Sequence, residues 1–218
     1  MKIAIIYRGN IRGFKYEECF KTHEKLYNDL NEHNIDFDTY LCTNNIEYDE
    51  NSINKIKNLK GKYILNIDDI RNDSKYIQAF SNIKFTSHGW SDYYQNNIIT
   101  YWYNNNYLYE QMTEKYDKYI IMDIAHIIDK LKISLLMETE NYCSIYESNN
   151  GYNTRLLIAN YELFNSIMKL FNYIVYNKLT FINPEEMSMI LLKNHNIIKT
   201  DKIKIYRIRW DGTIINGF

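Results

Sequence analysis

Short apolar runs alternate with amphipathic stretches along most of this chain, and this alternation constrains the fold more than any other feature. Residues 2–7 form a nearly continuous apolar run with β-branched side chains, followed by a loop with two glycines, which is typical of a buried parallel strand. In residues 16–32 apolar side chains recur every three or four positions, which predicts an amphipathic helix. Strand, loop and helix in this order begin a βαβ unit.

The same alternation predicts the elements that follow. We expect strands at residues 38–43, 62–67, 119–123, 143–146, 156–159 and 204–208, and helices at 51–59, 91–116, 161–176 and 184–192. Pro184 suits the first turn of the last helix, because the amide that proline lacks would be unpaired there. The sequence therefore predicts an α/β fold, a Rossmann-like, open and mostly parallel sheet flanked by helices.

The size and composition of the chain indicate one folding unit. With 218 residues, one proline, seven glycines and neither a linker nor a repeat, the sequence predicts a single domain over residues 1–218. The formal net charge is −1, with 26 basic and 27 acidic side chains mixed along the chain. Such a charge balance does not attract a polyanion, so we expect no nucleic-acid partner.

The cysteines and the apolar runs bear on where the protein works. Cys19, Cys42 and Cys143 are odd in number and widely spaced, which fits neither a disulfide framework nor a zinc site with paired ligands. The opening apolar run stops at Arg8, before a signal-peptide core would be complete, and no stretch is long enough to span a bilayer. We therefore expect a soluble cytoplasmic protein without a transmembrane segment.

The loop after the first strand is the first candidate ligand site, because ligands of open α/β sheets bind beyond the carboxyl ends of the strands. Gly9 and Gly13 would let a phosphate approach the backbone, and Arg8 and Arg12 would neutralise a diphosphate. An ordinary turn with solvated arginines is the alternative. The loop lacks the Gly-x-Gly-x-x-Gly pattern, and the chain has no Gly-Lys-Ser/Thr phosphate loop, which argues against NAD-dependent and P-loop enzymes.

Carboxylates and a histidine provide a second candidate site. Asp123 ends the expected strand at residues 119–123, and with His126 it would supply one hard and one borderline ligand for Mg²⁺ or Mn²⁺. The alternative is that Asp123 caps a helix or forms a turn. Asp92, at the start of the long helix, is likewise either a helix cap or a catalytic carboxylate.

Polar side chains also gather at a later expected turn. Tyr152, Asn153 and Arg155 offer an aromatic face, an amide and a guanidinium, a set that suits the hydroxyls of a sugar or ribose. A polar hairpin followed by a core strand explains the same residues. No Ser-His-Asp or Cys-His order is compelling, so a hydrolase with its own nucleophile is not indicated.

Four segments of the chain, taken in order, resemble a known group of proteins. They are "KIAIIYRGNIRGF", "NNIITYWYNNNYLYEQMTEKYDKYIIM", "GYNTRLLIAN" and "FINPEEMSMILLKNHNIIKTDKIKIYRIRWDG". Together they resemble small glycosyltransferase-like proteins of large DNA viruses and of bacterial surface-polysaccharide clusters, and the resemblance covers nearly the whole chain.

This resemblance implies a GT-A type fold and the transfer of a sugar from a nucleotide-sugar donor, a UDP- or GDP-sugar, to a glycan or glycoprotein acceptor, usually with Mn²⁺ or Mg²⁺. It implies that Gly9 and Arg12 help to hold the nucleotide, and that a viral member would work in the host cytoplasm. The chain departs from the family at "IMDIAH", which displaces Asp123 by about two positions, and at Thr154, which replaces a carboxylate.

These departures leave three functions open. In an active glycosyltransferase, Arg8 and Arg12, with a metal if one binds, would stabilise the leaving diphosphate, and Asp92, Asp123 or His126 would accept the proton of the acceptor hydroxyl. A catalytically silent binding or scaffold protein would have kept the fold and lost the reaction. A nucleotide-dependent enzyme of another kind is the third, since a fold alone does not fix a function.

Overall fold

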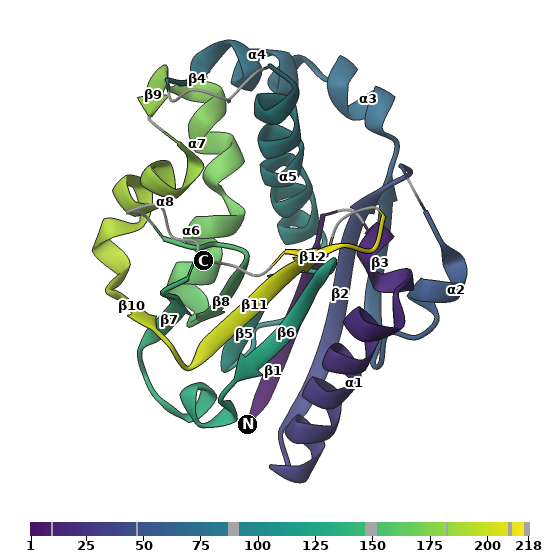
Figure 1. Ribbon diagram of the computed structural model, residues 1–218. Helices are drawn as coiled ribbons and strands as arrows, with labels where there is room; N and C mark the ends of the chain where they lie inside the picture. The colour runs from purple at the N-terminus through teal and green to yellow at the C-terminus, as the bar shows by residue number, and fades with distance from the viewer. Residues whose placement is uncertain are drawn as a thin grey trace.

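A seven-stranded sheet forms the centre of the protein, with the strand order β10-β7-β8-β5-β1-β2-β3 (Figure 1). The computed structural model describes residues 1–9, 11–46, 48–86, 92–146, 152–181, 183–208 and 211–215, without the side chains of residues 12, 92–94 and 184. The strands of this sheet are β1 Lys2–Arg8, β2 Asp36–Asn44, β3 Leu59–Leu65, β5 Lys118–Asp123, β7 Asn141–Ser144, β8 Leu156–Ala159 and β10 Ile197–Thr200. All run parallel except β8, which is antiparallel to both of its neighbours. The expected open, mostly parallel sheet is confirmed.

Helices cover one face of this sheet. They are α4 Ser74–Asn82, α5 Asp92–Gln111, α6 Tyr161–Met168 and α7 Leu170–Tyr176. Because side chains of a strand alternate between faces, Ala4 and Ile6 of β1 belong to the same buried cluster as Trp102 and Leu108 of α5. Even-numbered residues of β1 therefore face the helical layer.

The opposite face is covered by a helix and a small sheet. Helix α1 Glu17–Glu32 lies beside a three-stranded sheet made of β6 His126–Leu131, β11 Ile203–Ile208 and β12 Ile214–Ile215 (Figure 1). Ile3 and Ile5 share a buried cluster with Leu26 and Leu30 of α1, as the period of the helix predicted. Odd-numbered residues of β1 therefore face this second layer.

Three expected helices differ in length from the prediction. Instead of residues 51–59, α2 spans Glu50–Ile53, because Asn58 adopts a left-handed conformation (φ 51) and leads into β3. The long helix α5 ends at Gln111 rather than 116, since the chain must extend to place the Asp117 amide on the Lys2 carbonyl. The expected helix 161–176 is two helices, α6 and α7, which break at Lys169.

Shorter elements complete the fold. They are η1 Ile11–Lys15, α3 Ile67–Asn72, β4 Ile83–Phe85, η2 Ile133–Met137, β9 Leu179–Phe181, α8 Pro184–Leu192 and η3 Lys193–His195. Helix α8 begins at Pro184 as expected, with the Asn183 side chain capping it. Within the described ranges, none of the helices combines the length and the apolar character needed to cross a bilayer.

Candidate functional site

The candidate site lies where β1 and β5 end side by side at the middle of the sheet. Arg8 and Asp123 are partners in the parallel register, and strand alternation points both side chains toward α5. The Arg8 Nε lies 3.5 Å from the Asp123 Oδ1, and the guanidinium carbon lies 4.1 Å from the ring centre of Tyr101 on α5. The Arg8 Nη2 also donates a hydrogen bond to the Thr154 carbonyl. The ends of β1 and β5 therefore bring two of the predicted site residues, Arg8 and Asp123, together.

Burial separates the roles of these two residues. The Arg8 side chain is fully buried, whereas the Asp123 side chain keeps 22% of its surface exposed. A ligand at this edge of the sheet could therefore contact Asp123 directly, whereas the buried Arg8 would act on it only through its positive charge. Arg8, predicted to bind a diphosphate directly, lies beneath the surface of the site.

The charges of two more arginines act on the same carboxylate. The Asp123 amide donates to the Arg155 carbonyl at 3.0 Å, because β5 and β8 pair up to this point, and the Arg155 side chain is 22% exposed. Arg207 on β11 pairs in register with His126 on β6, and its side chain is exposed. The charges of Arg155 and Arg207 both act on Asp123. The guanidinium group of Arg8 therefore lies beside this carboxylate, and the charges of two further arginines act on it.

Burial dominates the protonation of the titratable groups here. It raises the pKa of Asp123 above its ordinary value, although the positive charges of Arg8 and Arg155 oppose this change. Burial, together with the charges of Arg155 and Arg207, holds the pKa of His126 well below its usual range, so the imidazole is neutral. A perturbed carboxyl and a neutral imidazole at one point are a physical mark of a functional site.

Several buried polar atoms of this cluster have no hydrogen-bond partner among the described residues. They are Nε and Nη1 of Arg8, Oδ1 of Asp123, both ring nitrogens of His126 and Oε2 of Glu185. The other such atoms in the described part belong to neutral side chains of β2 and α5, so every titratable one lies in this cluster. Since buried polar groups are normally paired, these atoms indicate a place for a polar ligand or for water.

A chain of hydrogen bonds supports the site from the face that α1 covers. His23 Nε2 lies 2.8 Å from the His126 carbonyl oxygen and must donate, because a carbonyl only accepts. His23 Nδ1 therefore accepts from the Tyr7 hydroxyl at 2.8 Å, and the Tyr7 oxygen accepts from the Tyr27 hydroxyl at 2.8 Å. The direction of all three bonds is thus determined, and they hold the turn that joins β5 to β6.

The two positions of the first loop that hold glycine require it for different structural reasons. Gly9 has a φ of +84, which favours glycine, and a Cβ built there would have no atom of the described residues, its chain neighbours aside, within 4 Å. At Gly13 a Cβ would come within 2.5 Å of Ile208 and 2.7 Å of the Ala125 side chain. Gly9 thus lies open beside the site, while Gly13 permits close packing. The expectation that Gly13 lets a phosphate approach is corrected.

The turn before β8 presents Arg155. The Asn153 side chain donates to the Tyr146 carbonyl at 2.8 Å and accepts from the Arg155 amide at 3.0 Å, so it is engaged by backbone groups. The Tyr152 amide donates to the Glu185 carbonyl at 3.2 Å. The Glu185 Oε1 lies 3.6 Å from the Arg155 Nη2. Helix α8 is thereby tied to the turn, and Glu185 joins the site.

Some predicted residues lie partly outside the described residues, and others were missed. The backbones of Arg12 and Asp92 belong to η1 and α5, but their side chains fall outside the description. Tyr101, Glu185 and Arg207 join the site without having been selected from the sequence. Tyr101 had a helical spacing that indicated core, and the charged Glu185 and Arg207 looked like ordinary helix and strand surface.

The described residues do not fit a divalent cation at Asp123 and His126. The Asp123 carboxylate is already paired with the guanidinium of Arg8, and together with His126 it offers only two candidate ligands. No group of three or more His, Cys, Asp or Glu side chains with metal-ligand geometry occurs among the residues described. The positive charges of Arg8, Arg155 and Arg207, which act on Asp123, would also disfavour a bound cation.

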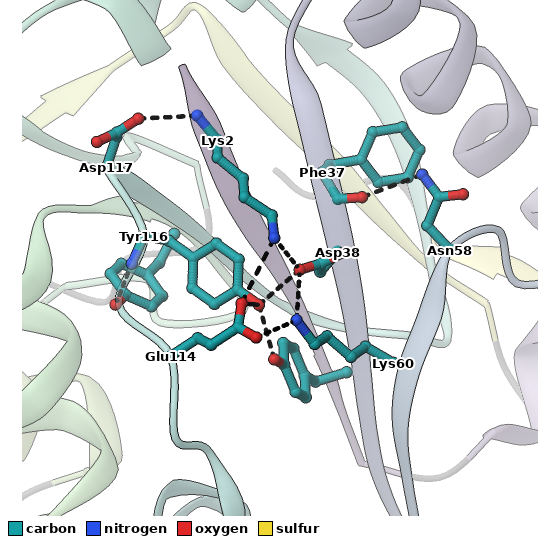
Figure 2. Close-up of polar contacts among 10 residues, drawn as sticks. Lys2, Phe37, Asp38, Asn58, Lys60, Glu114, Tyr116 and Asp117 are labelled. Atoms are coloured by element: carbon teal, nitrogen blue, oxygen red, sulfur yellow. Dashed lines mark hydrogen bonds and ion pairs between the residues drawn. The ribbon is translucent and has the colours of Figure 1, made fainter.

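A cavity of about 650 Å³ lies at the opposite end of the sheet, lined by residues at the starts of β1, β2 and β3. Figure 2 shows its charged neighbours. Lys2 Nζ lies 2.8 Å and Lys60 Nζ 3.2 Å from Asp38 Oδ2, and the Tyr116 hydroxyl donates to the same oxygen at 2.7 Å. Because its charges are paired and it lies at the amino ends of the strands, we place the functional site at the other end.

Comparison with known proteins adds a likeness of shape. No protein-family model matches the sequence, and no curated protein matches it. The structure of mouse xyloside xylosyltransferase 1 in its apo form aligns with a TM-score of 0.47 and 10% identity, covering 92% of this chain and 86% of that one. Galactosyltransferase LgtC, in complex with donor and acceptor sugar analogues, aligns with a TM-score of 0.42 and 9% identity, covering 93% of this chain and 68% of that one. At these values the likeness concerns shape alone and assigns no activity or residue to this chain.

Proposed function

We propose that this chain transfers a sugar from a UDP- or GDP-sugar to a glycan or glycoprotein acceptor. One observation carries the proposal: a partly exposed carboxylate where β1 and β5 end is paired with the guanidinium group of Arg8 and is also acted on by the charges of Arg155 and Arg207, next to Gly9 with its positive φ. This edge of an open α/β sheet is where ligands bind. The positive charge and the open backbone both suit a diphosphate.

The arginines would supply the electrostatic part of the reaction. A leaving nucleoside diphosphate gains negative charge as the bond to the sugar breaks, and fixed positive groups stabilise that charge. Arg155 and Arg207 are exposed enough to contact the phosphates, and Arg8 adds its charge from below. Because the described residues do not fit a cation, we propose that these arginines act without the Mn²⁺ or Mg²⁺ that was expected.

Asp123 is our candidate for the proton acceptor. In the proposed step the acceptor hydroxyl oxygen forms the new bond to the anomeric carbon, the bond to the diphosphate breaks, and the hydroxyl proton moves to Asp123. Burial raises its pKa above the ordinary value, which makes the carboxylate a stronger proton acceptor. His126 is a weaker base because its pKa is depressed, and Asp92 remains a candidate whose side chain lies outside the described part.

A donor panel tests the proposal. Purified protein is incubated with UDP- and GDP-sugars, once with Mn²⁺ and once with EDTA, and release of nucleoside diphosphate is measured with and without glycan acceptors. We expect release from one donor in both conditions, a large loss in Arg155→Ala, and no change in Lys60→Ala at the opposite end of the sheet. If no donor binds and none is hydrolysed, the proposal is wrong. Nucleotide binding without release would instead favour a catalytically silent binding protein.

A further inference from the structure

We propose that Glu185, together with Arg155, binds hydroxyl groups of the sugar that the donor carries. This inference rests on the proposed function and adds the residue that would recognise the transferred group. It starts from a buried carboxylate that neither the sequence patterns nor the proposed reaction has used.

The local structure places this carboxylate firmly. Glu185 is the second residue of α8, whose first turn is capped by the Asn183 side chain through the Glu186 amide at 2.8 Å. The positive end of the helix stabilises a negative charge at this position. The Glu185 carbonyl accepts from the Tyr152 amide, which fixes the helix start against the turn before β8. The side chain is therefore held on a regular element and not on a free loop.

The two oxygens of this carboxylate are unequal. Oε1 lies 3.6 Å from Arg155 Nη2, which is too long for a hydrogen bond, and the side chain is 10% exposed. Oε2 is buried and has no hydrogen-bond partner among the described residues. Arginine–carboxylate pairs frequently form two short parallel bonds that engage both oxygens, and this pair does not. The observed arrangement leaves acceptor capacity for an incoming donor.

The location of the pair determines which hydroxyls it would meet. Arg155 contacts both acidic residues, since its carbonyl accepts from the Asp123 amide at 3.0 Å and its Nη2 lies 3.6 Å from the Glu185 Oε1. If the diphosphate binds on the Asp123 side of Arg155, the sugar attached to the distal phosphate comes next along the donor. A carboxylate accepts two hydroxyl hydrogens and a guanidinium donates to hydroxyl oxygens, so the pair matches neighbouring hydroxyls of a pyranose.

The test compares the nucleotide with and without its sugar. Calorimetric titrations measure the affinity of the full-length protein for UDP and GDP and for the corresponding UDP- and GDP-sugars. Glu185→Gln keeps the shape and removes the charge, so we expect a loss of about tenfold in affinity for the sugar nucleotide and an unchanged or slightly higher affinity for the free diphosphate. Glu186→Gln, one residue further along the same helix, serves as the control and should change neither value.

The outcomes separate this inference from the function on which it rests. If the unmodified protein binds neither nucleotides nor sugar nucleotides, the proposed function is wrong and this inference with it. If it binds both, and Glu185→Gln weakens them equally or not at all, the function stands and the role of Glu185 is wrong. A selective loss for the sugar nucleotide supports the inference. Thermal unfolding of the variant distinguishes a binding defect from a folding defect.

Discussion

Charged side chains gather at both ends of the central sheet, but the two ends differ in how completely the polar atoms of these side chains are paired. At the amino end, Lys2, Asp38, Lys60 and Glu114 contact one another, and Tyr116 donates to Asp38 (Figure 2). At the carboxyl end, several buried polar atoms of Arg8, Asp123, His126 and Glu185 have no hydrogen-bond partner among the described residues. The charged groups of the first arrangement are paired with one another, whereas the second leaves polar atoms to which a ligand could bind.

The buried polar atoms without hydrogen-bond partners, and not the cavity, indicate at which end of the sheet a ligand binds. A cavity of about 650 Å³ lies at the amino end, next to the paired charges. A folded protein normally satisfies its buried polar groups, so a place where charged ones remain unsatisfied indicates a binding or catalytic role. The number of charges alone would have pointed to either end.

Removing one positively charged side chain at each end should give the largest difference in stability. Arg8→Met leaves Asp123 without its buried partner, and we expect the free energy of unfolding to fall by about 3 to 5 kcal/mol. Lys60→Met removes a charge from an exposed network and should cost far less. Urea denaturation of both variants measures the difference, and equal losses would contradict the comparison.

Acid should affect the two ends in different pH ranges. Burial lowers the pKa of His23 from 6.5 to about 4, so the unfolded chain takes up the proton first, and the stability that neutral His23 contributes is lost as the pH falls from 6.5 to 4. That loss would reach about 3 kcal/mol. His23→Gln should flatten this part of the stability curve, measured by urea denaturation from pH 8 to pH 4.

The amino end should respond only at lower pH. Burial acts to raise the pKa of Asp38, but hydrogen bonds from Lys2, Tyr116 and Lys60 outweigh it and lower this pKa below 3.8. The stability from ionised Asp38 is therefore present above pH 3.8 and is lost as the pH falls through the lowered value. An Asp38→Asn variant that changed the curve between pH 6.5 and 4 would contradict this assignment.

A conservative change of the carboxylate at each end should separate activity from structure. We expect Asp123→Asn to reduce donor turnover about a hundredfold, because the proposed proton acceptor is removed while the shape is kept. Asp38→Asn should leave turnover unchanged. Steady-state rates of nucleoside diphosphate release measure both, and a similar loss in the two variants would show that Asp123 has no special role.

Glycine substitutions should have the smallest effect on stability, but they should distinguish nucleotide binding at the two ends of the sheet. Gly9→Ala strains a backbone at φ +84 and Gly61→Ala brings a Cβ within 2.8 Å of the Tyr40 ring. Each should cost about 1 kcal/mol of stability. Gly9→Ala alone should weaken UDP or GDP binding, because only Gly9 lies beside the proposed diphosphate site. Calorimetry with both variants decides this, and weaker binding in Gly61→Ala would count against it.

Local patterns in the sequence were sufficient for much of the framework. The apolar run before Arg8 and the one before Asp123 predicted two buried strands, and both are confirmed beside each other in the sheet. The helical period of residues 16–32 predicted α1. The break at Lys169 was not predictable in this way, because the apolar stripe continues through it from α6 into α7.

The alternation of strands and helices, and the position of Arg8 and Asp123 at strand ends, follow from local sequence patterns, because these depend on neighbours a few positions away. The distant residues that complete the site are brought together by the fold and are not predictable from such patterns. His23 meets the carbonyl of His126 across 103 positions, and Glu185 meets Arg155 through the docking of α8. Such contacts follow from the order of the strands and the face that each side chain takes, which no local period contains.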